Sequence, residues 1–381
     1  MTSTPASSVL RVQELVDTIA LHLLPSIWDL RNLSLVAKSC TASCQRLLFR
    51  NIILNRGAFD IDHASALESD DEAGKAHRLA EVLQGSPHLC VYVRRLRLAF
   101  EPGVLEALSA LPFANLREVV LHRRGGGAIT AEAIRLAASL VALPSLERVG
   151  LIYAIFTTMR DIAALFAGAH PGLTAITLMD VNVVDPTDLD VEGAKRTVVR
   201  KLYAEDSHYR YDQSWLLNPN APFDLSRVEE LAYGRRLNQT ASQLLKAVEK
   251  TLVRVTVDAQ YAVDISYANN AKNPALLASF PRLKHVIITS TAPGLRDVAT
   301  LLSAVSPPTL ETVTIVFDPG MSRGRADAGL ERLRELFTSG WESCEVRFVI
   351  PKARLEGEKG VVLKAKVESV FAGKLWIGSS M

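Results

Sequence analysis

Cysteine is scarce in this chain of 381 residues: only Cys40, Cys44, Cys90 and Cys344 occur. A disulfide framework needs a high density of cysteines, and a structural zinc site needs closely spaced pairs of Cys or His ligands. Cys40 and Cys44 are four positions apart, but no second pair of ligands accompanies them. We therefore expect four small, buried, reduced cysteines, no bound metal and no other cofactor.

A surplus of one charge is also lacking. The chain has 43 basic and 41 acidic residues, which gives a formal net charge of +2. Proteins that bind nucleic acid or acidic membranes attract phosphate through a large positive surplus. Neither kind of partner is expected here. With 48% hydrophobic and 22% charged residues, the composition is that of a globular protein.

Long hydrophobic runs are missing as well. No uninterrupted apolar stretch of about 18 residues occurs, so no transmembrane helix is expected. The first residues, "MTSTPASSVLRVQELVD", lack the basic start and apolar run of a secretory signal. These absences predict a soluble protein of the cytoplasm or the nucleus.

Local catalytic motifs are absent too. The sequence contains no His-Glu-x-x-His, Gly-x-Ser-x-Gly or Gly-x-Gly-x-x-Gly, and its eight histidines are scattered. We expect a protein that is not an enzyme. The alternative is a triad assembled in space, since triads are defined by geometry rather than by sequence order.

The chain does contain one recurrent apolar pattern. "LPSLERVGL" (143–151) and "FPRLKHVII" (280–288) both place apolar residues at the first, fourth and sixth positions of a frame. The fourth positions of nine such frames are 23 to 31 residues apart, and they are Leu96, Val119, Val149, Ile176, Leu202, Leu231, Val255, Val286 and Val313. A period of this length is typical of repeat architectures.

Each repeat combines a strand with a helix. The fourth and sixth positions alternate with polar residues, as in strands, and helix-like segments lie between them at 130–143, 157–169, 240–250 and 294–305. Thr130 is a predicted N-cap. One such unit cannot bury its own apolar face, so stacked units are expected to share a core. An ordinary α/β domain with a parallel sheet is the rival interpretation.

This pattern resembles an irregular leucine-rich repeat array covering residues 91–350. The resemblance implies an α/β fold in which the repeats form a solenoid with a parallel sheet. Residues 58–90 are expected to be a linker with a short helix, and residues 351–381 a C-terminal cap or tail. The Asn or Cys usual in such repeats is mostly missing.

Residues 1–57 read as three short helices, with Ser26 as a predicted cap. Glu14-Leu15 with Ile19, "LSLVAKSC" (33–40) and "LLFRNIIL" (47–54) resemble an F-box of the fungal type, which often precedes degenerate leucine-rich repeats. Two positions depart from that pattern: Arg11-Val12 stands where Leu-Pro usually opens the motif, and Cys40 stands where Trp is frequent.

The resemblance implies the substrate-recognition subunit of a Skp-cullin-F-box ubiquitin ligase, with a Skp-type adaptor, a cullin scaffold and an unknown target protein as partners. The residues expected to contact the adaptor are Leu15, Ile19, Leu30, Leu33 and Val36; some of them must also form the core of the three helices. The alternative is a leucine-rich-repeat interaction scaffold with an N-terminal helical cap and no role in ubiquitin transfer.

The expected target surface is formed by the third and fifth positions of each frame. The candidates for target binding are Arg95, Arg97, Arg148, Lys201, Tyr203, Arg254 and His285, and Glu118, Thr177, Thr256 and Thr314 share this face. The basic bias favours an acidic or phosphorylated target; a merely solvated face is the alternative. Residues 205–225 fit no repeat, so Tyr209, Tyr211 and Trp215 form either a contact loop or a local packing cluster.

Overall fold

The computed structural model describes residues 5–54, 72–123, 127–187, 196–205, 213–234, 239–258, 280–291, 295–303, 309–318, 326–338, 341, 344–349, 367 and 377–378. The chain divides into two units. The first comprises residues 1–174 and 183–197, and the second comprises residues 175–182 and 198–381. Each unit is described by itself below.

The first unit begins with three helices, as the sequence predicts: α1 (Pro5–His22), α2 (Ile27–Val36) and α3 (Lys38–Leu48). The hydroxyl of Ser26 caps α2 by accepting a hydrogen bond from the backbone N–H of Asp29 at 3.3 Å. Ala37 adopts an extended conformation and separates α2 from α3. The predicted cap at Ser26 is confirmed.

Four parallel strands follow in chain order: β1 (Asn51–Ile53), β2 (Arg95–Ala99), β3 (Glu118–His122) and β4 (Arg148–Ile152). Their register places Ile52 opposite Leu96, Leu96 opposite Val119, and Val119 opposite Val149. The fourth positions of the sequence frame are therefore paired and buried, as expected.

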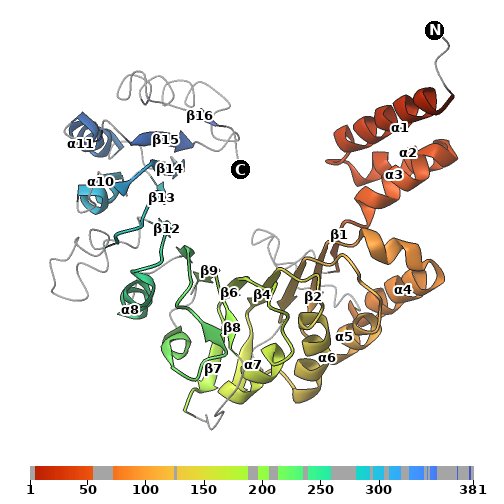
Figure 1. Cartoon of the computed structure of the whole chain (residues 1–381), viewed down its shortest axis with the longest axis horizontal. Helices are drawn as coiled ribbons and strands as arrows, with labels where there is room; N and C mark the ends of the chain where they lie inside the picture. Colours follow the sequence, from red (N-terminus) through yellow and green to blue (C-terminus); the bar gives the residue numbers. More distant parts are fainter. Residues whose placement is uncertain are drawn as a thin grey trace. The chain divides into compact units, whose positions relative to one another are not determined.

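Helices cover one side of these strands (Figure 1). They are α4 (Glu72–Gly85), α5 (Pro102–Ser109), α6 (Ala131–Val141) and α7 (Met159–Phe166), with the 3-10 helix η1 (Pro87–Tyr92) before β2. Thr130 caps α6 as predicted, since its hydroxyl accepts from the N–H of Ala133. Thr158 and Asp161 cap α7 reciprocally in a capping box.

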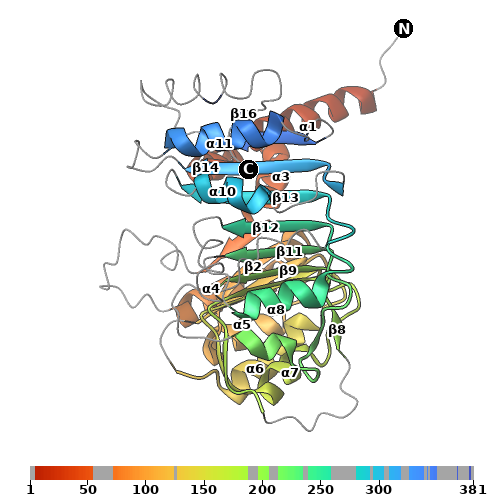
Figure 2. The same ribbon diagram turned by 90° about the vertical axis from the view of Figure 1, so that its left-hand side faces the viewer.

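The described part of the second unit has eight parallel strands in chain order: β6 (Ala175–Met179), β9 (Lys201–Glu205), β11 (Glu230–Gly234), β12 (Arg254–Asp258), β13 (His285–Thr291), β14 (Thr312–Asp318), β15 (Glu345–Val349) and β16 (Ile377–Gly378). Figure 2 shows β12, β13 and β14 side by side. Ile176, Leu202, Leu231, Val255, Val286, Val313 and Val346 occupy one row of paired positions.

The helices of the second unit are α8 (Gln239–Val248), α10 (Leu295–Ser303) and α11 (Ala326–Thr338), with the 3-10 helix η2 (Gln213–Leu217). Among the described residues there are two further pairs of short strands. They are β5 (Ile155–Thr158), which belongs to the first unit, with β7 (Asn182–Asp185), and β8 (Thr197–Val198) with β10 (Phe223–Asp224). The helices predicted within 240–250 and 294–305 correspond to α8 and α10.

The fold is mixed α/β with a large parallel sheet, and within each unit the described strands of that sheet pair in chain order. Sequential order is what stacked strand-and-helix repeats predict. The paired strands extend beyond the expected array of residues 91–350, because β1 precedes it and β16 follows it. Likewise α4, in the expected linker region, packs against α5.

Candidate interaction surfaces

The three N-terminal helices share a small core. Ala20, Leu30 and Cys44 are buried at its centre, and the partly buried residues packed against them are Leu23, Leu33, Leu47 and Leu48. Each helix contributes one central residue, so removal of any helix would expose the side chains of the other two. The core therefore holds the three helices together as one module.

A polar cluster also joins α1 to α3. Ser43 donates a hydrogen bond to the carboxylate of Asp17 at 2.5 Å, and the side-chain amide of Gln13 donates to both residues. Arg46 lies 3.8 Å from the same carboxylate. The hydrogen bond from Ser43 is the main reason why the pKa of Asp17 is lowered, and burial opposes it. The ionised form of Asp17 is thus favoured, and it links α1 to α3 through Ser43 and Arg46.

Exposed apolar side chains are concentrated on α1, α2 and the turn between them. Among the described residues, thirteen large hydrophobic side chains are exposed, and eight of them form what we call the helical apolar set: Leu15, Ile19, Leu21, Leu24, Ile27, Trp28, Leu35 and Val36. Scattered exposed apolar residues are normal, but a concentration of them marks an interaction surface. The rest of the described chain exposes only five.

The predicted adaptor-contact residues divide between core and surface. Leu15, Ile19 and Val36 are exposed and belong to the helical apolar set. Leu30 is only 1% exposed, and Leu33 packs against the same core. In this structure the side chain of Leu30 is closed to a partner, because it fills the centre of the three helices.

The sequence interpretation selected Val36 but missed the other two most exposed members of this set. Trp28 is 73% exposed and Leu35 is 84% exposed. Tryptophan is enriched among residues that dominate the binding energy of interfaces. The position of Trp28, two residues after the Ser26 cap and two before buried Leu30, was the available signal, since such spacing turns it away from the core.

In the first unit, the predicted target face carries a charge ladder. Arg95, Glu118 and Arg148 occupy paired positions on β2, β3 and β4. The carboxylate of Glu118 lies 2.8 Å from the guanidinium of Arg95 and 3.4 Å from that of Arg148. One acid thus bridges two predicted target-binding bases. Arg97, on the same face, is half-buried, and burial lowers the pKa of its guanidinium.

The second unit repeats this arrangement. Lys201 lies 2.8 Å from Glu230 on the neighbouring strand. His285 lies 4.0 Å from Glu311, which is also paired with Lys284 at 2.6 Å. Arg254 is exposed on β12. Tyr203 is half-buried and donates a hydrogen bond to Glu205.

These ion pairs neutralise part of the positive charge of the predicted target face. The predicted face was characterised by its basic residues, but glutamates in the same row lie beside most of them. The row of residues just before the strands behaves in the same way, since Arg117 pairs with Glu147 at 3.2 Å and Arg200 with Glu229 at 3.8 Å. The face is therefore still basic, but its glutamates neutralise part of that charge.

The irregular stretch 205–225 is described only in part. Trp215 is 2% exposed and packs against Phe223, with the ring centroids 6.3 Å apart. Its indole is thus a packing element and not an exposed contact. Tyr209 and Tyr211 lie outside the described residues.

The remaining site expectations concern metals, cysteines and membranes. Cys40, Cys44, Cys90 and Cys344 are all buried free thiols, as predicted, and burial raises the pKa of Cys44 and Cys90. Within the described residues, no three His, Cys, Asp or Glu side chains gather in a way that could hold a metal ion. Among the described residues, no helix is both long enough and apolar enough to cross a membrane.

Comparisons with known proteins give little. No protein-family model matches the chain, and no curated protein matches it. Among solved structures, it is similar to the leucine-rich repeat-containing protein LegL7 from Legionella pneumophila, with 12% sequence identity and a TM-score of 0.36 over 68% of this chain and 94% of that chain. The repeat architecture of this chain rests on its own in-register strands and not on that likeness.

Proposed function

We propose that this chain is a substrate-recognition subunit of a Skp-cullin-F-box ubiquitin ligase. In this proposal the helical apolar set on α1 and α2 binds a Skp-type adaptor, which tethers the chain to a cullin scaffold. The strand face of the repeats binds the target protein. The chain itself performs no chemistry, because a ligase held on the same scaffold transfers ubiquitin by proximity.

One observation carries the proposal: eight of the thirteen exposed large hydrophobic side chains of the described residues lie between Leu15 and Val36. A three-helix module that served only to shield the sheet would direct its apolar side chains towards the sheet. Instead, the module has its own core around Leu30 and leaves a second apolar set in solvent. Exposure of that kind favours a partner protein.

The second candidate function is a repeat scaffold without a ubiquitin role. The departure at Arg11-Val12 from the usual Leu-Pro favours it, because that dipeptide usually helps to contact the adaptor in the F-box family. The two candidates share the target-binding repeats. They differ only in whether α1 and α2 bind a Skp-type adaptor.

The test is co-purification of the full chain with a Skp-type adaptor on a sizing column. We expect a stable complex with the unchanged chain and none with Trp28→Asp/Leu35→Asp, a variant that charges two exposed positions and leaves the core intact. Val82→Asp, at an exposed position of α4, is the matched control and should still bind. A well-folded chain that forms no complex would favour the scaffold.

A further inference from the structure

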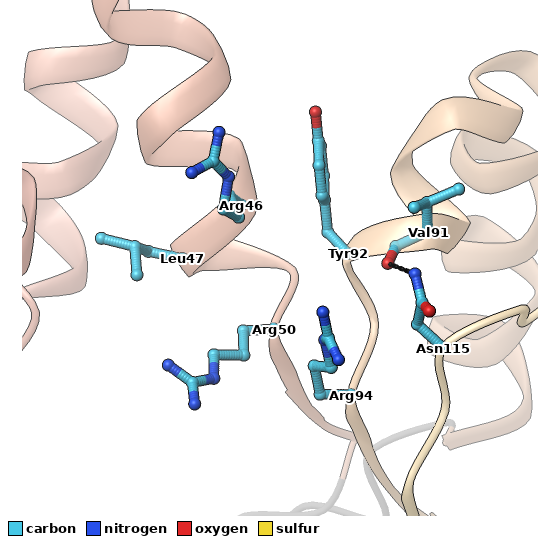
Figure 3. Close-up of a pocket in the computed structure, with 7 residues that line it drawn as sticks. All are labelled: Arg46, Leu47, Arg50, Val91, Tyr92, Arg94 and Asn115. Carbon is cyan, nitrogen blue, oxygen red and sulfur yellow. Dashed lines mark hydrogen bonds between the residues drawn. The ribbon is translucent and has the colours of Figure 1, made fainter. Parts of the chain in front are cut away.

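A hollow of about 410 Å³ lies in the first unit, where α3 meets η1 and the starts of β1 and β2. Three of its seven lining residues are arginines: Arg46, Arg50 and Arg94. Figure 3 shows Arg46 on α3 and Tyr92 on the opposite wall, with Arg50 and Arg94 below them. None of the lining residues is acidic. The hollow therefore concentrates positive charge in a protein whose net charge is nearly zero.

The backbone beneath these arginines is fixed. The carbonyl of Arg50 accepts hydrogen bonds from the N–H groups of Arg94 and Arg95, at 2.9 and 3.0 Å. The side-chain amide of Asn115 donates to the carbonyl of Val91 at 2.9 Å and holds the second wall. The three side chains thus start from ordered positions on two walls, which is the preorganisation that binding sites need.

Arg50 and Arg94 break the charge pattern of the strand starts. In the same row, Arg117 pairs with Glu147, Arg200 with Glu229 and Lys284 with Glu311. Arg50 and Arg94, by contrast, precede the paired residues Asn51 and Arg95, so two arginines occupy neighbouring positions of this row. Neighbouring like charges on paired strands are unfavourable. An external anion would relieve this repulsion.

The helix end explains only part of the cluster. Arg46 lies in the last turn of α3, where a cation interacts favourably with the helix dipole, and it also approaches Asp17 at 3.8 Å. Arg94 comes from the other wall and has neither role. The stability of α3 therefore does not explain why Arg94 and Arg50 line the same hollow as Arg46.

We propose that this arginine pocket binds a phosphorylated side chain of the target protein. Guanidinium groups bind phosphate through paired, charge-assisted hydrogen bonds, and the pocket supplies three of them. Leu47, Val91 and the ring of Tyr92 line the same hollow and offer apolar contacts to the residues beside the phosphate. A peptide fits this mixture better than nucleic acid, which needs a broad positive surface that a net charge of +2 does not provide.

This inference deepens the proposed function, since it names the chemical class of the target, and it rests on the repeats having a protein target. Adaptor binding tests the other half of that function independently, because the pocket lies outside the helical apolar set. Variants of the pocket should leave the adaptor complex intact.

The experiment measures the fluorescence anisotropy of two labelled peptide libraries with the full chain. One library carries a central phosphoserine between degenerate positions, and the other carries serine there. We expect the phosphorylated library to bind at least about tenfold more tightly, because charge-assisted hydrogen bonds carry the affinity. Equal affinities for the two libraries would overturn the proposal.

Three variants locate the site. Arg50→Gln and Arg94→Gln should each remove most of the preference for phosphoserine, whereas Arg135→Gln, at an exposed position of α6, should preserve it. Circular dichroism verifies that all three are folded. If the preference survives in the folded pocket variants, the arginine pocket is not the site.

Two competition experiments test whether the phosphate that the pocket binds belongs to a peptide, to a free anion or to a lipid. Inorganic phosphate should displace the peptide only at far higher concentration, since it lacks the apolar contacts. If it competes as well as an unlabelled phosphopeptide, a free anion is the ligand and the peptide proposal fails. Vesicles of anionic phospholipid that bind more tightly than the peptide, and lose binding in Arg94→Gln, would assign the pocket to membranes instead.

Discussion

Ile52 lies directly opposite Leu96 in the parallel pairing of β1 with β2, so the strand that follows the three helices belongs to the sheet of the repeats. Ile52 is buried. The N–H of Leu54 also donates to the carbonyl of Arg97 at 3.1 Å. The helical module is therefore joined to the sheet by a strand, and a cut at the expected boundary after residue 57 would remove that strand.

Deletion of residues 1–57 should destabilise the first unit, because it uncovers the edge of β2. Loss of the buried side chain of Ile52 alone costs on the order of 2 kcal/mol. A chain that begins at Arg50 keeps β1 and is the control. We expect the thermal unfolding temperature to fall clearly further for the first truncation than for the second. Equal temperatures for both would mean that β1 adds nothing to stability.

Leu30→Ala should destabilise the three-helix module by about 2–5 kcal/mol, because it opens a cavity between Ala20 and Cys44. Leu35→Ala removes the same atoms from an exposed position of α2 and should change stability by less than about 0.5 kcal/mol. Urea unfolding followed by circular dichroism measures both. Similar effects for the two variants would contradict the assignment of core and surface on this helix.

The register of the sheet could be predicted from the sequence because the fourth and sixth positions of the frame are apolar in nearly every repeat. The fourth positions of the frame, such as Val255 and Val286, are paired across neighbouring strands. The strand at Ile52 escaped prediction because three residues carry too little periodicity, and the next strand begins only at Arg95. Strand β16, which pairs with β15, is shorter still, with two residues.

The core face of α2 was harder to predict, since apolar residues surround that helix and no single stripe stands out. Leu30 and Leu35 have the same chemistry, and only packing against Ala20 and Cys44 separates them. The charge ladder, in contrast, could have been predicted from the sequence. Once the frame is set, Glu118 falls between Arg95 and Arg148, but a sum of basic residues along the face conceals that pairing.

Asp17 gives a prediction for pH. Its pKa is lowered from the usual 3.8 in the folded chain, so its ionised form stabilises the folded state above that pH. This contribution is lost as the pH falls through the lower, folded-state pKa. The unfolding temperature of Asp17→Asn should thus lie below that of the unchanged chain near neutral pH, and the gap should narrow below about pH 3.8.

The control for Asp17→Asn is Glu14→Gln, which removes an exposed carboxylate from the same helix. Its difference from the unchanged chain should be smaller near neutral pH, since Glu14 makes no side-chain ion pair with any described residue. A constant gap for Asp17→Asn across the whole range would show that the ionisation of Asp17 is not the source of its stabilising effect.

Glu118→Gln tests whether the carboxylate of Glu118 neutralises the two arginines that lie beside it on the strand face. Glu118 pairs with both Arg95 and Arg148, but surface ion pairs contribute little, so the loss of stability should not exceed about 1 kcal/mol and should shrink in high salt. Glu106→Gln, an exposed position on α5, is the matched control for net charge.

The same variant has a larger expected effect on binding. Without the carboxylate, the guanidinium groups of Arg95 and Arg148 are released towards solvent, and the face becomes basic in the way that its arginines alone suggest. Binding of an acidic probe such as polyglutamate should therefore increase for Glu118→Gln and stay unchanged for Glu106→Gln. If both variants bind polyglutamate equally, the gain reflects net charge only, and the ladder does not mask Arg95 and Arg148 from acidic partners.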